Sequence, residues 1–154
     1  MNEGPLVKGN PLRISVYALL FCYIIGEFIL PKYPLIYIIN LIGITGLIIS
    51  LIFFFSGFEI FKSYKENPVP TSASKRLIKT GIFAYTRNPI YLSFVLFHFS
   101  MFLVFENVMY FLTSITLFIW INNYVIKPEE EYLTNTFGDE YIRYKEAVGK
   151  WIIF

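Results

Sequence analysis

The sequence predicts an all-α, polytopic integral membrane protein with four transmembrane helices, a cytoplasmic loop and a C-terminal amphipathic helix. Apolar residues make up 56% of its 154 residues and charged residues only 16%, whereas soluble domains average about 45–50% and about 25%. The apolar residues gather in four long runs, and almost all basic residues lie on one side of these runs. This composition excludes a disordered chain, a nucleic-acid-binding tail and an ordinary cytosolic enzyme.

Each apolar run is close to the roughly 20 residues that a helix needs to cross a hydrocarbon core of about 30 Å. The predicted spans are residues 14–30, 35–61, 89–105 and 108–126. Short polar connections at 32–34 and 106–107 predict two tight helical hairpins. We therefore expect residues 1–154 to form a single membrane domain.

The basic residues predict the orientation of this domain in the membrane. All 13 lysines and arginines except Lys32 lie in the N-terminal segment, in the loop 62–88 or in the C-terminal segment 127–154. Because cytoplasmic loops carry an excess of Lys and Arg, both termini and the long loop are expected in the cytoplasm. A site for a polar ligand is expected there too, since these segments hold most of the polar residues.

The C-terminal segment 127–154 has the pattern of helical structure. Asp139 is a suitable N-cap, and Tyr141, Tyr144 and Val148 follow at a spacing close to the helical period. This pattern predicts an amphipathic helix, either lying on the membrane or folded back on the bundle. The apolar run 151–154 ends the chain.

Several common kinds of site are absent from the sequence. With one cysteine, Cys22, and one histidine, His98, neither a disulfide within the chain nor a cysteine-based zinc site can form. No metal site is predicted. The chain also has no G-x-G-x-x-G, P-loop or H-E-x-x-H motif, so a Rossmann-type nucleotide site is not expected.

One group of chemically useful residues precedes the third predicted span. Gly81 lets the backbone turn or approach a ligand closely, and Pro89 suits the first turn of a helix. Arg87 is a fixed cation that can bind a carboxylate or phosphate through two hydrogen bonds. Tyr85 and Tyr91 offer aromatic faces that can hold a cation. The alternative reading is an arginine anchor with an aromatic belt at the membrane surface.

A second group, Glu129-Glu130-Glu131, directly follows the fourth predicted span. Successive residues of a helix point about 100° apart, so at most two of these carboxylates can face one site. Such a carboxylate could hold an ammonium group, ribose hydroxyls or Arg87. The alternative reading is that the glutamates only cap and solvate a helix start.

The two groups together resemble the isoprenylcysteine carboxyl methyltransferase family. Residues 77–92, LIKTGIFAYTRNPIYL, are similar to its G-x-[YF]-x-[YF]-x-R-[HN]-P-x-Y signature. Residues 129–145 are similar to its E-E-x-x-L-x-x-x-F-G-x-x-Y-x-x-Y segment, and 67–71 to the proline-containing segment upstream. Asn88 fits the signature but stands where eukaryotic members have histidine, and Ser93 and Ser100 stand in place of glycines.

The resemblance implies a membrane methyltransferase that uses S-adenosylmethionine on the cytoplasmic side and methylates a lipidic or prenylated acceptor. It assigns catalytic roles to Arg87 and Glu130. The cofactor-binding residues that it implies are Gly81, Tyr85, Arg87, Asn88, Pro89, Tyr91, Glu129 and Glu130. Methylation of an isoprenylcysteine-type carboxylate is favoured, with phospholipid amine N-methylation as the alternative. An amine acceptor would need a base, for which a glutamate or His98 is the candidate.

Two other classes remain open from the sequence: a sterol-reductase-like enzyme that uses NADPH, and a non-catalytic membrane protein of the same fold. Expected partners are the acceptor and membrane lipid, without nucleic acid. Association into a homodimer is also left open.

Overall fold

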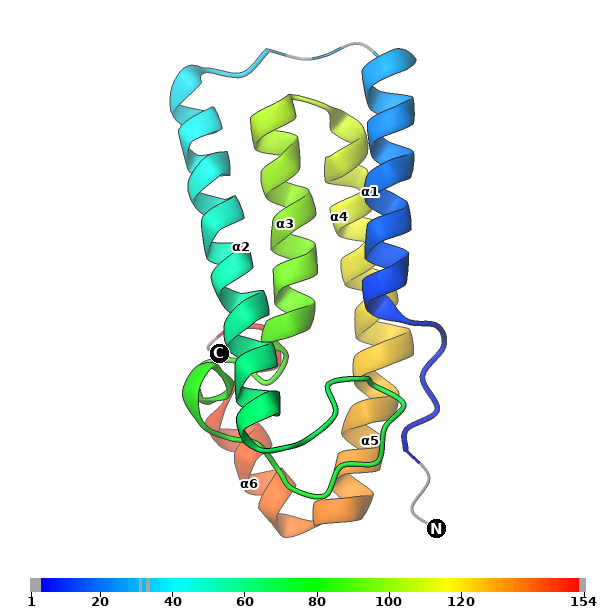
Figure 1. The fold of residues 1–154 in the computed structure, drawn as a ribbon, viewed down its shortest axis with the longest axis vertical. Coiled ribbons are helices and arrows are strands. Elements are labelled where there is room, and N and C mark those ends of the chain that lie inside the picture. The colour runs from blue at the N-terminus through cyan, green and yellow to red at the C-terminus, as the bar shows by residue number, and fades with distance from the viewer. Residues whose placement is uncertain (1–3, 31, 33, 153–154) are drawn as a thin grey trace.

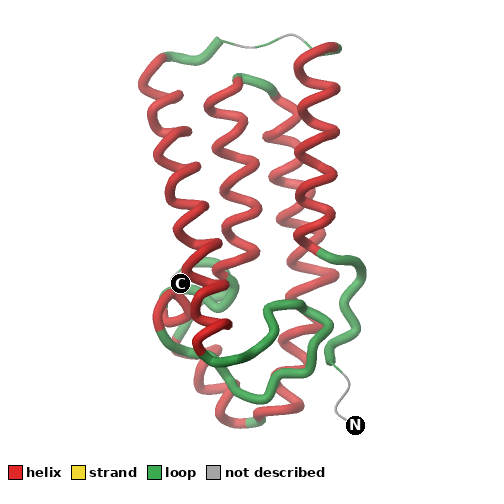
Figure 2. Tube along the Cα trace, viewed as in Figure 1, coloured by secondary structure: helices red, strands yellow, loops and turns green. Residues whose placement is uncertain are grey.

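The computed structural model describes residues 4–30, 32 and 34–152. Within these ranges the protein is helical and contains no β-strand (Figures 1 and 2). The elements are α1 (Pro11–Phe28), α2 (Tyr37–Ser63), the 3₁₀-helix η1 (Gly81–Ala84), α3 (Pro89–Phe105), α4 (Val108–Ile121), the π-helix η2 (Asn122–Ile126), α5 (Lys127–Phe137) and α6 (Asp139–Ala147). The predicted all-α class is confirmed.

Three helices are long and apolar enough to cross a membrane: α1, α2 and the continuous helix Val108–Phe137 that α4, η2 and α5 form. Helix α3 is apolar but has only 17 residues, a length of about 26 Å. The expected count of four spans therefore stays a prediction. The bounds of α3 agree with the sequence prediction. The start of α4 at Val108 also agrees with the prediction, and its helix continues past the predicted end at residue 126 to Phe137.

The predicted bounds of the first two helices need correction. Helix α1 begins at Pro11, three residues before the predicted start, because the Asn10 side chain accepts hydrogen bonds from Leu12 N and Arg13 N at 3.0 and 3.2 Å. Because α1 ends at Phe28 and α2 begins at Tyr37, the connection between them is longer than the predicted turn at 32–34. At its other end, α2 continues to Ser63.

Helix α3 packs between α2 and α4, and α1 packs chiefly against α4 (Figure 1). The close approach of α2 to α3 depends on glycine. A Cβ atom at Gly46 would lie 2.3 Å from the Ser100 Oγ, and one at Gly43 would lie 2.8 Å from the Leu103 side chain.

Between α3 and α4 the chain turns within two residues, since Glu106 adopts the left-handed conformation and Asn107 caps α4. This confirms a tight hairpin at 106–107.

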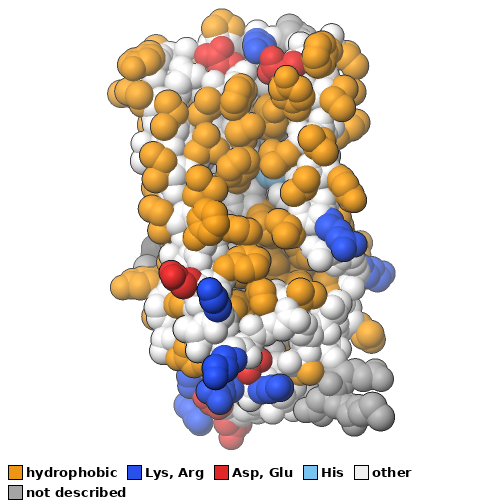
Figure 3. Space-filling view, in the orientation of Figure 1, with side chains coloured by type: hydrophobic (Ala, Val, Ile, Leu, Met, Phe, Trp, Pro, Cys, Tyr) orange, Lys and Arg blue, Asp and Glu red, His pale blue; other side chains and the backbone are white. Residues whose placement is uncertain are grey.

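The C-terminal segment forms two helices rather than one: α5 continues the helix of α4 and η2, and α6 folds back on the bundle. Gly138, with φ +53°, separates α5 from α6. Glycine suits this position because a residue with a Cβ is disfavoured in this backbone conformation. Tyr141 and Tyr144 of α6 are buried, and Trp151 stacks on Phe118 with ring centroids 4.9 Å apart. The fold therefore brings α6 and the end of the chain beside the start of α3, at the end of the bundle where most charged side chains gather (Figure 3).

Candidate functional site

A cavity of about 120 Å³ lies at the charged end of the bundle. Its walls come from the end of α2, the loop after it, η1, the start of α3, and the helices α5 and α6. Apolar and aromatic side chains line most of it, and five charged side chains enter the lining: Glu66, Arg76, Arg87, Glu129 and Glu130. A mostly apolar cavity with a few charged groups is the usual form of a small-molecule site.

Arg87 and Glu130 form an ion pair in this cavity. Arg87 Nη1 lies 2.9 Å from Glu130 Oε1, and the two side chains are only 9% and 15% exposed. Lys150 Nζ lies 3.6 Å from the other oxygen, Glu130 Oε2. Among the described residues, Arg87 Nε, Arg87 Nη1 and Glu130 Oε1 are buried without a well-aligned hydrogen bond. The pair therefore keeps hydrogen-bonding capacity for a ligand that carries both charges.

The C-terminal end of the chain fixes the backbone around Arg87. Arg87 N donates to Gly149 O at 3.0 Å. The carbonyl of Lys150 accepts hydrogen bonds from Asn88 Nδ2 at 2.8 Å and from Thr86 Oγ1 at 3.3 Å. Pro89 then opens α3. Asn88 thus joins the start of α3 to the C-terminal segment. It also lines the cavity.

The π-helix η2 sets the direction in which the two cavity glutamates point. Lys127 N donates to Asn122 O, five residues earlier, and this extra residue in the turn rotates α5 relative to α4. Glu129 and Glu130 of α5 consequently line the cavity, whereas Glu131 is exposed. The Tyr124 carbonyl accepts a hydrogen bond from Lys8 N at 3.3 Å, which docks the N-terminal segment beside the site.

Burial changes the acidity of groups around the cavity. Glu129 lies beyond the apolar stretch that ends at Ile126, and burial raises the pKa of its carboxyl to about 8, while the Tyr91 hydroxyl lowers it and the Glu130 charge raises it. Burial also raises the pKa of the Tyr141 and Tyr144 phenols well above their ordinary range. Both tyrosines therefore remain neutral, and Tyr144 donates to Phe83 O at 2.7 Å.

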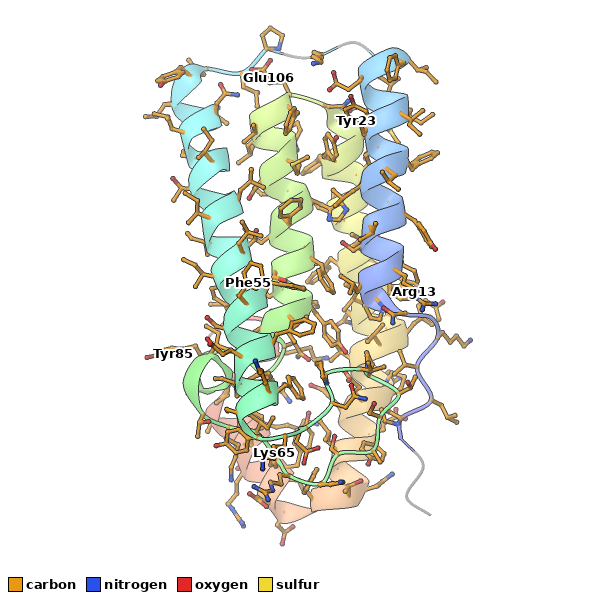
Figure 4. The ribbon with its side chains drawn as sticks, viewed as in Figure 1. Arg13, Tyr23, Phe55, Lys65, Tyr85 and Glu106 are labelled. Carbon is orange, nitrogen blue, oxygen red and sulfur yellow. The ribbon has the colours of Figure 1, made fainter. Side chains whose placement is uncertain are left out.

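Six of the eight predicted site residues line the cavity: Arg87, Asn88, Pro89, Tyr91, Glu129 and Glu130. Gly81 and Tyr85 do not. The Tyr85 side chain is 62% exposed and points away from the bundle (Figure 4). Gly81 has φ +59°, and Ile60 Cδ1 occupies the space of a Cβ there, so this glycine serves the packing of η1 against α2. His98, fully buried within α3, is also outside the cavity lining.

The sequence analysis missed four cavity residues, which come from the long loop, α5 and α6. Glu66, Tyr132, Tyr141 and Tyr144 all line the cavity. For the two tyrosines of α6 a signal existed, because their helical spacing indicated a buried face. No local pattern marked Glu66, whose place depends on how the chain turns after α2.

The helices and the cavity together define a class of protein: a helical membrane-type protein whose polar site lies at one end of the bundle and joins a buried cation to carboxylates. Residues 38–140 match the model of the phospholipid methyltransferase family. The chain belongs to this family, and the class that follows is that of a membrane methyltransferase. The match does not favour the reductase or the non-catalytic alternative.

Two relatives match parts of the chain. An uncharacterised protein of Haemophilus influenzae is 40% identical over 63 residues, which cover 41% of this chain and 100% of that protein. The protein-S-isoprenylcysteine O-methyltransferase of Saccharomyces cerevisiae is 35% identical over 82 residues, which cover 51% of this chain and 33% of the yeast enzyme. The matched region therefore spans only a third of the yeast protein's length.

Proposed function

We propose that the protein transfers a methyl group from S-adenosylmethionine to a lipidic or lipidated acceptor at the cytoplasmic surface of the membrane. The observation that carries this proposal is the Arg87–Glu130 pair, which is buried, oppositely charged and incompletely hydrogen-bonded. It lies in a cavity that is otherwise mostly apolar and aromatic.

The residues present fit the cofactor. Its amino-acid end carries a carboxylate and an ammonium group, which need a cation and an anion at short range. Arg87 would bind the carboxylate through its Nε donor, which has no hydrogen-bond partner among the described residues. Glu130, with Glu129 beside it, would bind the ammonium group. Tyr91, which lines the same cavity, offers an aromatic face to the sulfonium.

When bound, S-adenosylmethionine supplies an electrophilic methyl group carried on a sulfonium. Charge becomes more dispersed as the methyl group moves, and a cavity with fixed dipoles and little water favours that change. The apolar lining and the covering loop exclude water, and Arg87 and Glu130 orient the reacting groups. No covalent intermediate on the protein and no metal are required.

The proposal includes four spans, with α3 as the fourth, and both termini on the cytoplasmic side. Basic side chains gather at the end of the bundle that holds the cavity (Figure 3). At the opposite end, Lys32 is paired with Glu27 at 2.8 Å. This distribution supports a cytoplasmic site under the positive-inside rule. The acceptor then reaches the cavity from the bilayer.

For the acceptor we favour a carboxylate on a lipidated group, because the yeast relative is an O-methyltransferase by name. The alternative is a phospholipid amine, in line with the name of the family. The two differ in proton balance. An amine must lose a proton as it is methylated, whereas a carboxylate loses none, so only the amine requires a general base.

The test is methyl transfer by the purified protein in lipid vesicles, with isotopically labelled S-adenosylmethionine and either prenylcysteine analogues or aminophospholipids. Alkali releases methanol from a methyl ester but not from an N-methyl group. Label that becomes volatile in alkali would support carboxylate O-methylation, and stable label in phospholipid would support N-methylation. Binding of the cofactor without labelling of either acceptor class would overturn the proposed acceptors.

A further inference from the structure

Glu66 is an acidic residue of the cavity that lies outside both sequence motifs. It follows α2, at the start of the loop that runs across to α5 and back towards η1 (Figure 1). We call residues 67–74 of this loop the strap. Glu66 lines the cavity together with six strap residues: Asn67, Pro68, Val69, Pro70, Ser72 and Ser74.

The backbone turn after α2 directs Glu66 into the cavity. Lys65 adopts φ +56° (labelled in Figure 4), and Glu66 N donates back to Phe61 O at 3.0 Å. A residue with a Cβ enters this left-handed conformation only at a cost. The turn therefore fixes the position of the Glu66 backbone, from which its side chain enters the cavity lining.

Glu66 is only partly used by the protein itself. Its Oε2 accepts a hydrogen bond from Lys75 N at 3.3 Å. In the part of the chain that the structure describes, no hydrogen bond to its Oε1 is found. One carboxylate oxygen thus holds the base of the strap, and the other remains available to a ligand in the cavity.

The strap forms a stiff wall beside Glu66. Pro68 and Pro70 restrict the backbone, and Asn67 Oδ1 accepts from Val69 N at 3.0 Å in a local turn. The strap is attached to α5, because Ser74 N donates to the Tyr132 hydroxyl at 3.0 Å. Tyr132 and Leu133 of α5 face the same cavity. The proline-containing strap and the Tyr132 ring thus both line the cavity and are joined by this hydrogen bond.

We propose that Glu66 binds the ribose hydroxyls of the cofactor and that the strap and Tyr132 enclose its base. The inference rests on the proposed function, since the Arg87–Glu130 end of the cavity then takes the amino-acid part. The nucleoside part needs a flat apolar slot and an acceptor for a vicinal diol. A carboxylate supplies such an acceptor, as the acidic residue of dinucleotide-binding folds does for a ribose hydroxyl.

The experiment measures the affinity of detergent-purified protein for S-adenosylhomocysteine and for its 2′-deoxy analogue by calorimetry. In wild-type protein, removal of the 2′-hydroxyl is expected to weaken binding about tenfold, the loss of one hydrogen bond to a charged group. In Glu66→Gln the two ligands are expected to bind within about twofold of each other, because the partner of the hydroxyl is already weakened.

Glu59→Gln is the matched control, since Glu59 is an exposed glutamate of α2, the helix that precedes Glu66, and lies outside the cavity lining. It should keep the tenfold preference. Equal sensitivity to the 2′-hydroxyl in wild type and Glu66→Gln would overturn the assignment and leave Glu66 as a residue that only anchors the strap. Failure of wild-type protein to bind either ligand would instead count against the proposed function itself.

Discussion

Arg87 Nη1 and Glu130 Oε1 lie 2.9 Å apart in a nearly buried setting, yet neither atom makes a well-aligned hydrogen bond. Removing two charges from water costs several kcal/mol per ion, and only good geometry offsets that cost. An ion pair with unused donors is therefore poorly explained as a stabilising element. It is well explained as a site that a ligand with both charges completes.

Asn88 ties the start of α3 to the C-terminal end of the chain, so its loss should loosen the site. Asn88→Ala removes the 2.8 Å hydrogen bond to Lys150 O and leaves this part-buried carbonyl with only the bond from Thr86 Oγ1. We expect a loss of about 1–2 kcal/mol in unfolding free energy, measured by thermal unfolding in detergent. The exposed Asn135→Ala is the control. Equal stability of both variants would contradict this role for Asn88.

The contact of Gly46 with Ser100 predicts a size-compensation effect between α2 and α3. Gly46→Ala places a methyl group 2.3 Å from the Ser100 Oγ and should cost about 1–3 kcal/mol through overpacking. Adding Ser100→Ala removes that oxygen and should restore part of the loss. Thermal unfolding of both single variants and the double variant measures this coupling. Strictly additive effects would show that the two residues do not share the contact.

Much of the fold follows from the apolar runs, because a bilayer of fixed thickness demands long helices. The α3 bounds and the hairpin at 106–107 were predictable from Arg87-Asn88-Pro89 and Glu106-Asn107, which mark helix ends locally. The N-cap predicted at Asp139 lies one residue from the observed cap of α6, Gly138. The positive φ of Gly138, which ends α5, was not predicted from the local pattern.

The site residues that belong to the two sequence motifs were largely predictable. Those that only tertiary packing brings to the cavity were not. Arg87 and Glu130 come from two motifs and lie in contact. Tyr85, in the same motif as Arg87, faces outward because η1 turns its side chain away. Glu66 enters the cavity through the positive-φ turn at Lys65, a tertiary feature that no spacing rule indicates.

The raised pKa of Glu129, about 8 in the ligand-free protein, predicts that cofactor binding releases protons at pH 7. Below pH 8 the carboxyl is mainly protonated, and a bound cation favours its charged form and so lowers the pKa. The binding heat at pH 7 should therefore differ between phosphate and Tris buffers, which ionise with different enthalpies. Glu129→Gln should reduce this difference. Identical heats in both buffers for wild-type protein would contradict the prediction.

The proposed orientation predicts which positions are accessible from outside the cell. In a Cys22→Ser background, Lys32→Cys should react with a membrane-impermeant maleimide on intact cells. Glu131→Cys, on exposed α5, should react only after permeabilisation. Both positions are exposed, so burial does not explain a difference. Labelling of Glu131→Cys on intact cells would reverse the topology and place the cavity on the outer side.

The most direct test of the central claim is binding of S-adenosylmethionine to the purified, folded protein, with wild type beside Arg87→Ala and Glu130→Gln. We predict micromolar affinity for the wild type and at least a hundredfold weaker binding for each variant, since each leaves a ligand charge unpaired at about 3 kcal/mol. Thermal unfolding establishes that each variant is folded. A folded wild type that fails to bind, or variants that bind as tightly as wild type, would contradict the account.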